Sequence, residues 1–341
     1  MNMKPIPVPA AGTALHWQLD APYTARHVLI VMALLVVILF TGHRTEMDRM
    51  VVMSAQAVGN LVGVVDDSQV VRGLSRVGQS MWPPVAGEKE EVARLPDLDK
   101  DHLPWFSYIE AQERTEQRLN PQTLQMEIET ERLEYLVQPV GYLWTVFIKM
   151  IETLEIAIWG TLLSILVSVP LAYFAARNYS PNGTTYTLAR GTISLLRSAP
   201  ELIVALFLVL AYGFGPIAGV LALGLHAAGF LGKFYAEDIE NADKKPQEAL
   251  EAIGAGKLKT LWYGVIPQVM PQYIAYSMYI LDRNLRMATV IGLVGAGGIG
   301  QELKGRFDMF QYGHVATILL AIFIAVFLLD QFSARLRAKL I

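Results

Sequence analysis

Long apolar segments constrain this 341-residue chain more than any other feature of its sequence. A helix needs about 20 predominantly apolar residues to cross the hydrocarbon core of a membrane. The segments that approach this length are, in chain order, 27–42, 156–176, 193–212, 216–235, 274–294 and 315–332. Only 17% of the residues are charged, which is well below the level usual in soluble domains. The pattern predicts an all-α integral membrane protein with about six spans.

The basic residues near the ends of these segments predict the orientation. Lysine and arginine accumulate on the cytoplasmic side of membrane proteins. They gather in the loops 177–190 and 233–259 and again after the last segment, and an even number of crossings places all three groups, with the N-terminal residues 1–26, on one side. We therefore expect both termini to be cytoplasmic. The first segment, 27–42, is short, but no small-residue cleavage pattern follows it, so we expect an uncleaved anchor rather than a signal peptide.

The residues between the first two segments, 43–140, then lie outside. This part of the chain is acidic on balance, and its stretch 105–135 is rich in Glu, Gln, Arg and Leu. These are good helix formers, so we predict an external acidic helical segment. A docking surface for a partner is the alternative interpretation of the same residues.

Composition excludes several kinds of site. The chain contains no cysteine, which excludes disulfide frameworks, thiolate zinc sites and cysteine nucleophiles. Its net charge of −3 gives no indication of nucleic-acid binding. Internal repeats are not evident, so an inverted-repeat secondary transporter is not supported.

The cytoplasmic loop 238–267 is the most informative part of the chain. Asp243 or the Lys-Pro step after it can start a helix, since proline is favoured in the first turn. Gly254 and Gly256 interrupt that helix, and a second short helix leads through Trp262 toward the next span. A helix–glycine–helix elbow at a membrane surface is a rigid structure to which a soluble partner could bind. A plain amphipathic connector is the alternative.

The elbow also contains a spaced set of residues, namely Glu248, Ala249, Gly254, Ile266 and Pro267. With this set and spacing, it resembles the EAA loop of permease subunits from ATP-driven (ABC) importers. Leu250 stands where the family has a third-position Ala, Gly264 stands at an Ile position, and Ile266 replaces Leu. Further segments resemble the phosphonate permease branch, namely 197–203, 213–223, 226–233, 263–268, 283–300 and 330–337.

The resemblance implies a fold, an assembly and a function. Residues 141–341 would form the MetI-like permease domain of a type I importer, preceded by an extra N-terminal span. The chain would form a homodimer in the bacterial inner membrane, in contact with lipid, on cytoplasmic ATPase subunits and fed by a periplasmic binding protein. The implied cargo is a phosphonate or a related oxyanion such as phosphite. A methionine-type permease is the alternative within the family.

In the family, the EAA helix docks in a groove of the ATPase, so the residues implied to couple the subunits are Glu248, Ala249, Gly254 and Pro267. The stretch 254–260 superficially resembles a phosphate-binding loop. However, Glu251 stands at its first glycine position and Leu258 at its Ser/Thr position. The chain itself should therefore hold no nucleotide cofactor, and a partner would bind ATP and Mg²⁺.

A second glycine-rich stretch matches the dinucleotide fingerprint through Gly295, Gly297, Gly298 and Gly300. That fingerprint requires a strand before it and a βαβ unit around it. Here it follows an apolar segment at its outer end, so we expect a flexible turn or an outer gate instead.

Charged residues within spans are costly and usually functional. In the fifth segment, Asp282 and Arg286 lie one turn apart and should pair, which would leave Arg283 free to meet an anion. The planar fork of arginine suits phosphoryl oxygens. The candidate substrate-pathway residues are Arg283, Arg286, Asn284, Arg197 and His226. Pairing across helices without substrate contact is the alternative.

Two rivals come from other classes of protein. In the third segment, Glu201 follows Arg197 by one turn, and Pro200 should bend the helix between them. A proton-coupled secondary transporter could use Asp282, Glu201 and His226 as a relay. A membrane-anchored sensor could use the external acidic segment to bind a ligand.

Overall fold

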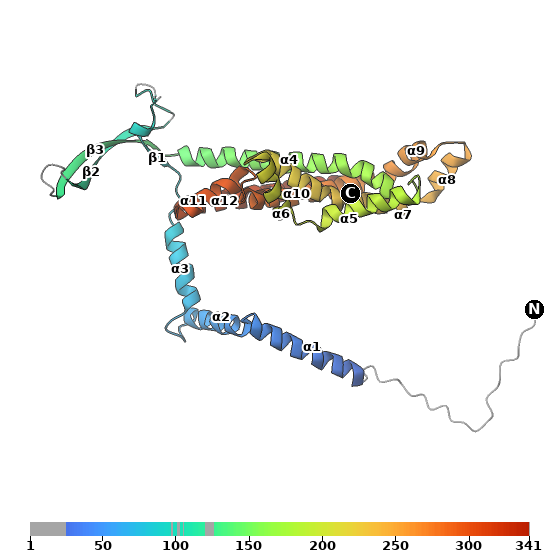
Figure 1. Cartoon of the computed structure of the whole chain (residues 1–341), viewed down its shortest axis with the longest axis horizontal. Helices are drawn as coiled ribbons and strands as arrows, with labels where there is room; N and C mark the ends of the chain where they lie inside the picture. Colours follow the sequence, from blue (N-terminus) through green and yellow to red (C-terminus); the bar gives the residue numbers. More distant parts are fainter. Residues whose placement is uncertain (1–24, 97, 101–102, 105, 120–125, 341) are drawn as a thin grey trace, which may run out of the picture. The chain divides into compact units, whose positions relative to one another are not determined.

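The computed structural model describes residues 25–96, 98–100, 103–104, 106–119 and 126–340. The chain divides into two compact units at Gly78. Almost all of the predicted cytoplasmic N-terminus, residues 1–24, lies outside the described residues. Figure 1 shows the helices and strands in chain order by colour.

The first unit is built from α1 (Ala25–Arg44), α2 (Met47–Leu61) and most of α3 (Gln69–Met81). Helix α1 contains the predicted anchor 27–42, and its apolar side chains are exposed along its whole length. A tight bend separates α1 from α2, with Glu46 in the left-handed region at φ 55°.

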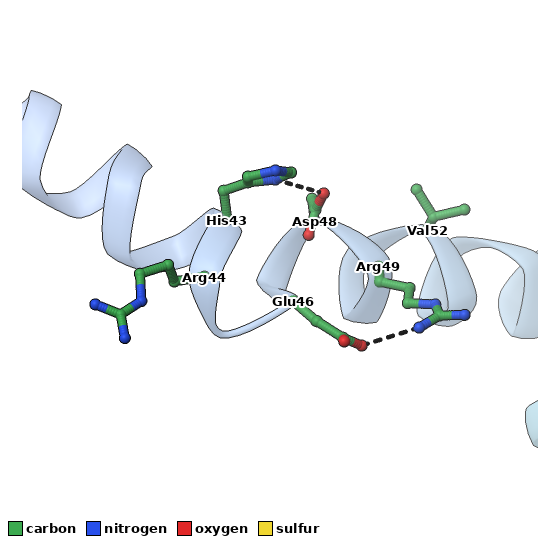
Figure 2. A pocket seen from close by; sticks show the side chains of 6 residues that line it. All are labelled: His43, Arg44, Glu46, Asp48, Arg49 and Val52. Carbon is green, nitrogen blue, oxygen red and sulfur yellow. Dashed lines mark hydrogen bonds and ion pairs between the residues drawn. The ribbon is translucent and has the colours of Figure 1, made fainter.

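The bend between α1 and α2 is closed by two ion pairs (Figure 2). His43 lies 3.2 Å from Asp48, and Arg49 donates to Glu46 over 3.0 Å. The backbone N–H of Arg49 and the ring of His43 hold the pKa of Asp48 below its ordinary value. Because these side chains are largely exposed, solvent screens both pairs.

The second unit begins with a three-stranded antiparallel sheet of order β1-β3-β2. Its strands are β1 (Glu88–Glu91), β2 (Tyr108–Leu119) and β3 (Met126–Gln138), with the short 3₁₀ helix η1 (Val92–Arg94) after β1. The prediction of a helix over 105–135 is therefore wrong. Polar and apolar residues alternate in β3, which is hydrogen-bonded to β1 on one side and to β2 on the other. This backbone pairing outweighs the helix propensity of the individual residues. Across β3, Lys89 of β1 also reaches Glu110 of β2 over 2.9 Å.

The sheet is tied to the helices beside it by partly buried polar contacts. Arg306 reaches Glu88 over 3.0 Å and Glu302 over 2.7 Å. The backbone carbonyl of Val85 accepts from Thr317 over 2.7 Å. Strand β3 also leads almost directly into the first long helix of the unit. The base of the sheet and the adjacent helix ends thus form one structure.

The rest of the second unit is helical (Figure 1). Its elements are α4 (Gly141–Ala175), α5 (Gly183–Ser198), α6 (Glu201–Tyr212), α7 (Pro216–Asn241), α8 (Lys244–Ala252), α9 (Lys257–Thr260), the π-helix η2 (Leu261–Val265), α10 (Ile266–Gly292), α11 (Gly298–Asp308) and α12 (Tyr312–Leu340). Helices α4 and α7 lie along each other, and small residues allow the approach. A Cβ on Gly160 would lie 3.0 Å from Leu223, and one on Gly224 would lie 2.6 Å from Leu163.

Four described helices are long and apolar enough to cross a membrane, namely α1, α4, α7 and α12. The third predicted span, 193–212, is broken into α5 and α6, which meet at a 90° bend beside Pro200 and count as a fifth span if taken together. This confirms the predicted bend. The predicted segment 274–294 lies in α10, which is 27 residues long and starts at Ile266, but its charges keep it out of this set. The number of spans by length and hydropathy is thus four to five, below the predicted six.

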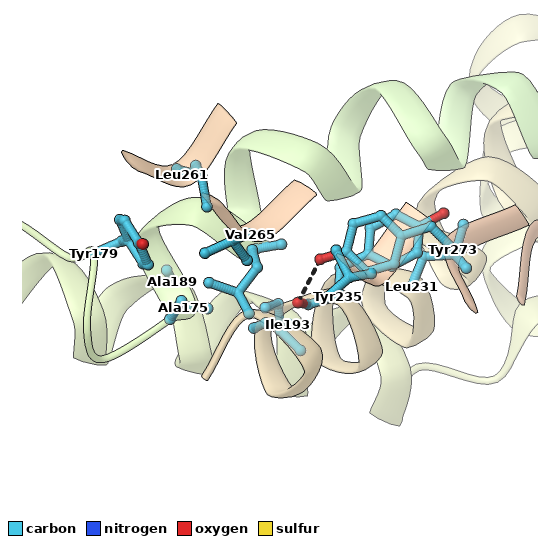
Figure 3. Packing of buried hydrophobic residues seen from close by; sticks show 14 of the residues in the cluster. Ala175, Tyr179, Ala189, Ile193, Leu231, Tyr235, Leu261, Val265 and Tyr273 are labelled. Atoms are coloured by element: carbon cyan, nitrogen blue, oxygen red, sulfur yellow. Dashed lines mark hydrogen bonds between the residues drawn. The ribbon is translucent and has the colours of Figure 1, made fainter. Parts of the chain in front are cut away.

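A cluster of buried apolar residues joins the ends of α4, α5 and α7 to the start of α10 (Figure 3). The rings of Tyr235 and Tyr273 stack with centroids 3.9 Å apart, and the hydroxyl of Tyr273 donates to the backbone carbonyl of Tyr235. Leu261 and Val265, from η2, pack into the same cluster. The loop 238–267 is therefore anchored on the helical core rather than suspended from it.

Candidate functional site

The loop 238–267 folds as the predicted elbow. Asp243 caps α8 by accepting from the backbone N–H of Lys245 over 3.1 Å. After α8, Gly254 adopts φ +86°, a left-handed conformation that favours glycine, and no atom lies within 4 Å of the position of a Cβ there. Gly256 then precedes α9, and Pro267 lies in the first turn of α10. The helix–glycine–helix prediction is confirmed.

The outer face of the elbow is exposed and partly apolar. Glu248 and Ala249 lie on the surface of α8. Beyond the turn, Ile253 is 81% exposed, Leu258 is 68% exposed and Trp262 is 64% exposed. A cluster of large apolar side chains in the open is a feature of interaction surfaces.

The inner face of the elbow is braced by hydrogen bonds to two long helices. The hydroxyl of Tyr179, just beyond α4, donates to Gln247 over 2.8 Å. The backbone N–H of Asp243 donates to the side chain of Gln268, on α10, over 3.0 Å, and the amide of Gln268 donates to the carbonyl of Gly264. Burial and the charge of Glu251 raise the pKa of Tyr179, so its hydroxyl remains a donor. A push on α8 would therefore reach α4 and α10 directly.

The charged residues of α6, α7 and α10 meet in one cluster. Arg283 donates to Glu201 over 2.8 Å, and His226 lies 2.7 Å from the other oxygen of Glu201. The second ring nitrogen of His226 lies 3.0 Å from the carbonyl of Ala199, at the bend. The expectation that Arg283 is left unpaired is wrong, because Glu201 pairs with it across helices.

Arg197 lies beside this cluster but outside its ion pairs. The 90° bend separates Arg197 from Glu201, so one-turn spacing does not bring them together. Its guanidinium instead lies over the ring of Phe230, 5.2 Å from the centroid, and Arg283 lies over the same ring at 4.9 Å. The Nε atom of Arg197 is buried and has no hydrogen-bond partner among the residues that the structure describes.

The remaining pathway candidates lie elsewhere on α10. Arg286 pairs with Asp282, as expected, and its side chain is half exposed. Asn284 is 2% exposed and donates to Thr161 of α4 over 3.0 Å. Asn284 thus occupies a packing position between two helices, and no contact brings it to the cluster around Glu201.

The glycine-rich stretch forms a closely packed corner between α10 and α11. Its glycines with positive φ are Gly295, Gly297 and Gly298. A Cβ on Gly295 would lie 2.3 Å from Phe214, and one on Gly300 would lie 2.0 Å from a backbone oxygen. The N–H of Gly298 donates to Glu152 over 3.0 Å. A helix precedes the corner, which confirms that this is not the strand-turn-helix setting of a dinucleotide site.

Sequence reasoning missed three contributors to these sites. Tyr179 and Phe230 carry no motif, and only the folded chain brings them against Gln247 and the two arginines. Glu152 satisfies the amide at the start of α11 from a distant part of the chain. In the part of the chain that the structure describes, no group of three or more His, Asp or Glu side chains is arranged to hold a metal ion.

Comparison with known proteins decides the family. Residues 168–341 match the model of the binding-protein-dependent transport system inner membrane component. This chain belongs to that family. It is therefore a multi-pass permease subunit of a bacterial ABC importer, and the family implies a separate ATPase and a binding protein as partners. Because the chain belongs to this family, the alternatives of a proton-coupled secondary transporter and of a membrane-anchored sensor are not supported.

Two relatives match this permease over more than half of its length. The putative phosphite transport system permease protein HtxE of Stutzerimonas stutzeri is 75% identical over 261 residues, which are 76% of this chain and all of the relative. The phosphite transport system permease protein PtxC of the same organism is 47% identical over 188 residues, which are 55% of this chain and 68% of the relative.

The fold is that of a solved importer. A chain of the MetNI methionine ABC transporter, in an inward-facing conformation, matches with a TM-score of 0.52 at 20% identity, over 58% of this chain and 97% of that chain. The predicted MetI-like fold is confirmed. At this identity the likeness shows the fold alone.

Proposed function

We propose that this permease imports phosphite or a related phosphonate with the free energy of ATP hydrolysis in a partner subunit. The observation that carries the proposal is the 75% identity to a putative phosphite transport permease over that relative's entire length. A methionine cargo has weaker support, because the likeness to the methionine transporter is structural and lies at 20% identity.

The proposed assembly is a dimer of this chain in the inner membrane, with cytoplasmic termini, a pair of ATPase subunits below and a periplasmic binding protein above. The basic residues of the elbow, such as Lys257 and Lys259, support its cytoplasmic placement. Its exposed apolar face around Ile253 and Trp262 supports a protein partner there. The sheet β1–β3 would then lie on the periplasmic side.

The coupling step that this proposal requires is mechanical. Closure of the ATPases would displace α8 through Glu248 and Ala249. The hydrogen bonds of Gln247 to Tyr179 and of Gln268 to Asp243 would pass that displacement to α4 and α10. Gly254 would shape the elbow and Pro267 would start the moving helix. ATP binding and hydrolysis would shift the population between two states of the permease.

The corner at Gly295, Gly297, Gly298 and Gly300 remains a proposed outer gate. Its position at the end of α10 supports that role, because motion of α10 would reach it directly. Because the corner packs closely against Phe214 and Glu152, we expect it to move as a rigid body rather than to flex as a turn.

The decisive experiment is uptake into proteoliposomes that hold the permease and its ATPase, with binding protein added outside the vesicles. We expect uptake of phosphite or methylphosphonate only when ATP and Mg²⁺ are present on the side of the ATPase. Uptake that proceeds without the ATPase, or that serves methionine but no phosphorus oxyanion, would contradict the proposal.

A further inference from the structure

The cluster around Phe230 carries an imbalance of charge. The guanidinium groups of Arg197 and Arg283 both lie over its ring. Among the described residues, Glu201 is the one carboxylate that contacts either arginine, and it contacts Arg283. The buried Nε of Arg197 has no hydrogen-bond partner within the described parts of the chain. An unmet buried donor beside excess positive charge is costly, so the arrangement suits a site that an anion completes.

Glu201 is held in a way that allows it to release Arg283. Its two oxygens have different partners, with Oε1 at 2.8 Å from Arg283 and Oε2 at 2.7 Å from His226. His226 is fixed in turn by its Nδ1–H, which donates to the carbonyl of Ala199, and its Nε2 also lies 2.9 Å from Arg283. If Arg283 moved to another anion, a His226 ring that carries a proton on both nitrogens would keep Glu201 paired. The carboxylate would not become an unpartnered buried charge, which lowers the cost of the exchange.

We propose that Glu201 is a built-in substitute anion, which holds Arg283 when no cargo is present and is displaced by an incoming oxyanion. The oxyanion then binds Arg283 and Arg197 beside Phe230. Guanidinium groups bind tetrahedral oxyanions through paired N–H donors. A neutral solute cannot replace the carboxylate, so the exchange selects for anions. This inference rests on the proposed function, because it assigns the cargo a site within the membrane domain.

The test is equilibrium binding of radiolabelled phosphite to the purified permease–ATPase complex in nanodiscs, without binding protein. In Glu201→Gln the competing charge is removed while the shape is kept. We expect phosphite to bind this variant about tenfold more tightly than the wild type. The gain should disappear when Arg197→Gln is added, because the second guanidinium is then missing.

The matched control is Glu240→Gln. Glu240 pairs with Arg190 over 2.9 Å between α7 and α5, away from Phe230. This variant also removes a cross-helix carboxylate from an arginine, which keeps a longer contact of 3.9 Å with Glu237, and its phosphite affinity should equal that of the wild type. An equal gain in both variants, or no gain in Glu201→Gln, would overturn the proposal.

If Glu201→Gln does not assemble with the ATPase, the single variant Arg197→Gln tests the proposal instead. It leaves the Glu201–Arg283 pair in place, and we expect the KM for ATP-driven phosphite uptake to rise at least severalfold. An unchanged KM would overturn the proposal. If the wild type transports no phosphorus oxyanion at all, the proposed function fails; if it does transport and these variants behave as the wild type, only the substitute-anion inference fails.

Discussion

Different kinds of interaction hold the elbow and the sheet, which lie at the two ends of α4. Beyond its C-terminal end, the elbow is held by a few neutral hydrogen bonds, such as Tyr179 to Gln247, and exposes apolar side chains. At its N-terminal end, the sheet is held by partly buried ion pairs around Arg306, whose side chain is 19% exposed. Because α4 is 35 residues long, about 50 Å separate the two.

The difference indicates which end is adapted to move against a partner. Neutral hydrogen bonds are individually weak, and the exposed apolar face of the elbow has no cover among the described residues. A partly buried arginine with two carboxylates is costly to separate from them, because separation leaves charges without partners. We infer that the elbow moves with its ATPase, while the sheet moves only together with the ends of α4, α11 and α12.

The largest effect is expected at the turn of the elbow. In Gly254→Asp, an aspartate must adopt φ +86° between α8 and α9. The elbow should change shape while the helical core remains folded. We expect ATP-driven uptake to fall more than tenfold, with ATP hydrolysis no longer stimulated by binding protein. Proteoliposome uptake and ATPase rates measured on the same preparation check this.

Gly254→Asn is the control, since asparagine tolerates the left-handed region better than most residues. It should keep much of the activity. If Gly254→Asp imports cargo like the wild type, the elbow is not the coupling element, and the contrast between the two ends disappears.

The second-largest effect is expected where the sheet contacts the helices through Arg306. Arg306→Gln leaves Glu88 and Glu302 without their partner, and we expect a loss of about 2 kcal/mol in local stability. Faster hydrogen exchange at the amides of β1 should reveal it. Exchange in α8 should stay unchanged, because Arg306 does not contact the elbow. Faster exchange at both ends would show that they are not independent.

The sequence predicted one end well and the other poorly for a physical reason. Local signals define the elbow, since Asp243 caps a helix and Gly254 ends it within one short stretch. The sheet depends on backbone pairing between strands far apart in the sequence, such as Glu88 of β1 with Gln138 of β3, and composition alone favoured a helix there.

The contacts of the charged residues on α10 were predicted only in part. Spacing along α10 predicted the pair of Asp282 and Arg286 correctly, because it lies within one helix. The partner of Arg283 could not be predicted in this way. Glu201 comes from another helix, and the bend beside Pro200 decides which groups it meets.

A smaller effect is expected from the brace between the elbow and α4. Tyr179→Phe removes the hydroxyl that donates to Gln247 and changes little else. The loss of one hydrogen bond of this kind is about 1 kcal/mol. We expect uptake to fall severalfold with assembly intact, as measured by co-purification of the ATPase. Equal losses of uptake and ATPase binding would assign Tyr179 to assembly rather than to transmission.

The smallest effect is expected from a surface pair at the sheet end. Lys89→Gln breaks the pair with Glu110, whose hydrogen bond raises the pKa of Lys89. Both side chains are exposed, so solvent already screens their attraction. Hydrogen exchange in β1 and uptake should both match the wild type. A loss as large as that of Arg306→Gln would mean that the sheet depends on its exposed ion pairs as much as on the partly buried ones around Arg306.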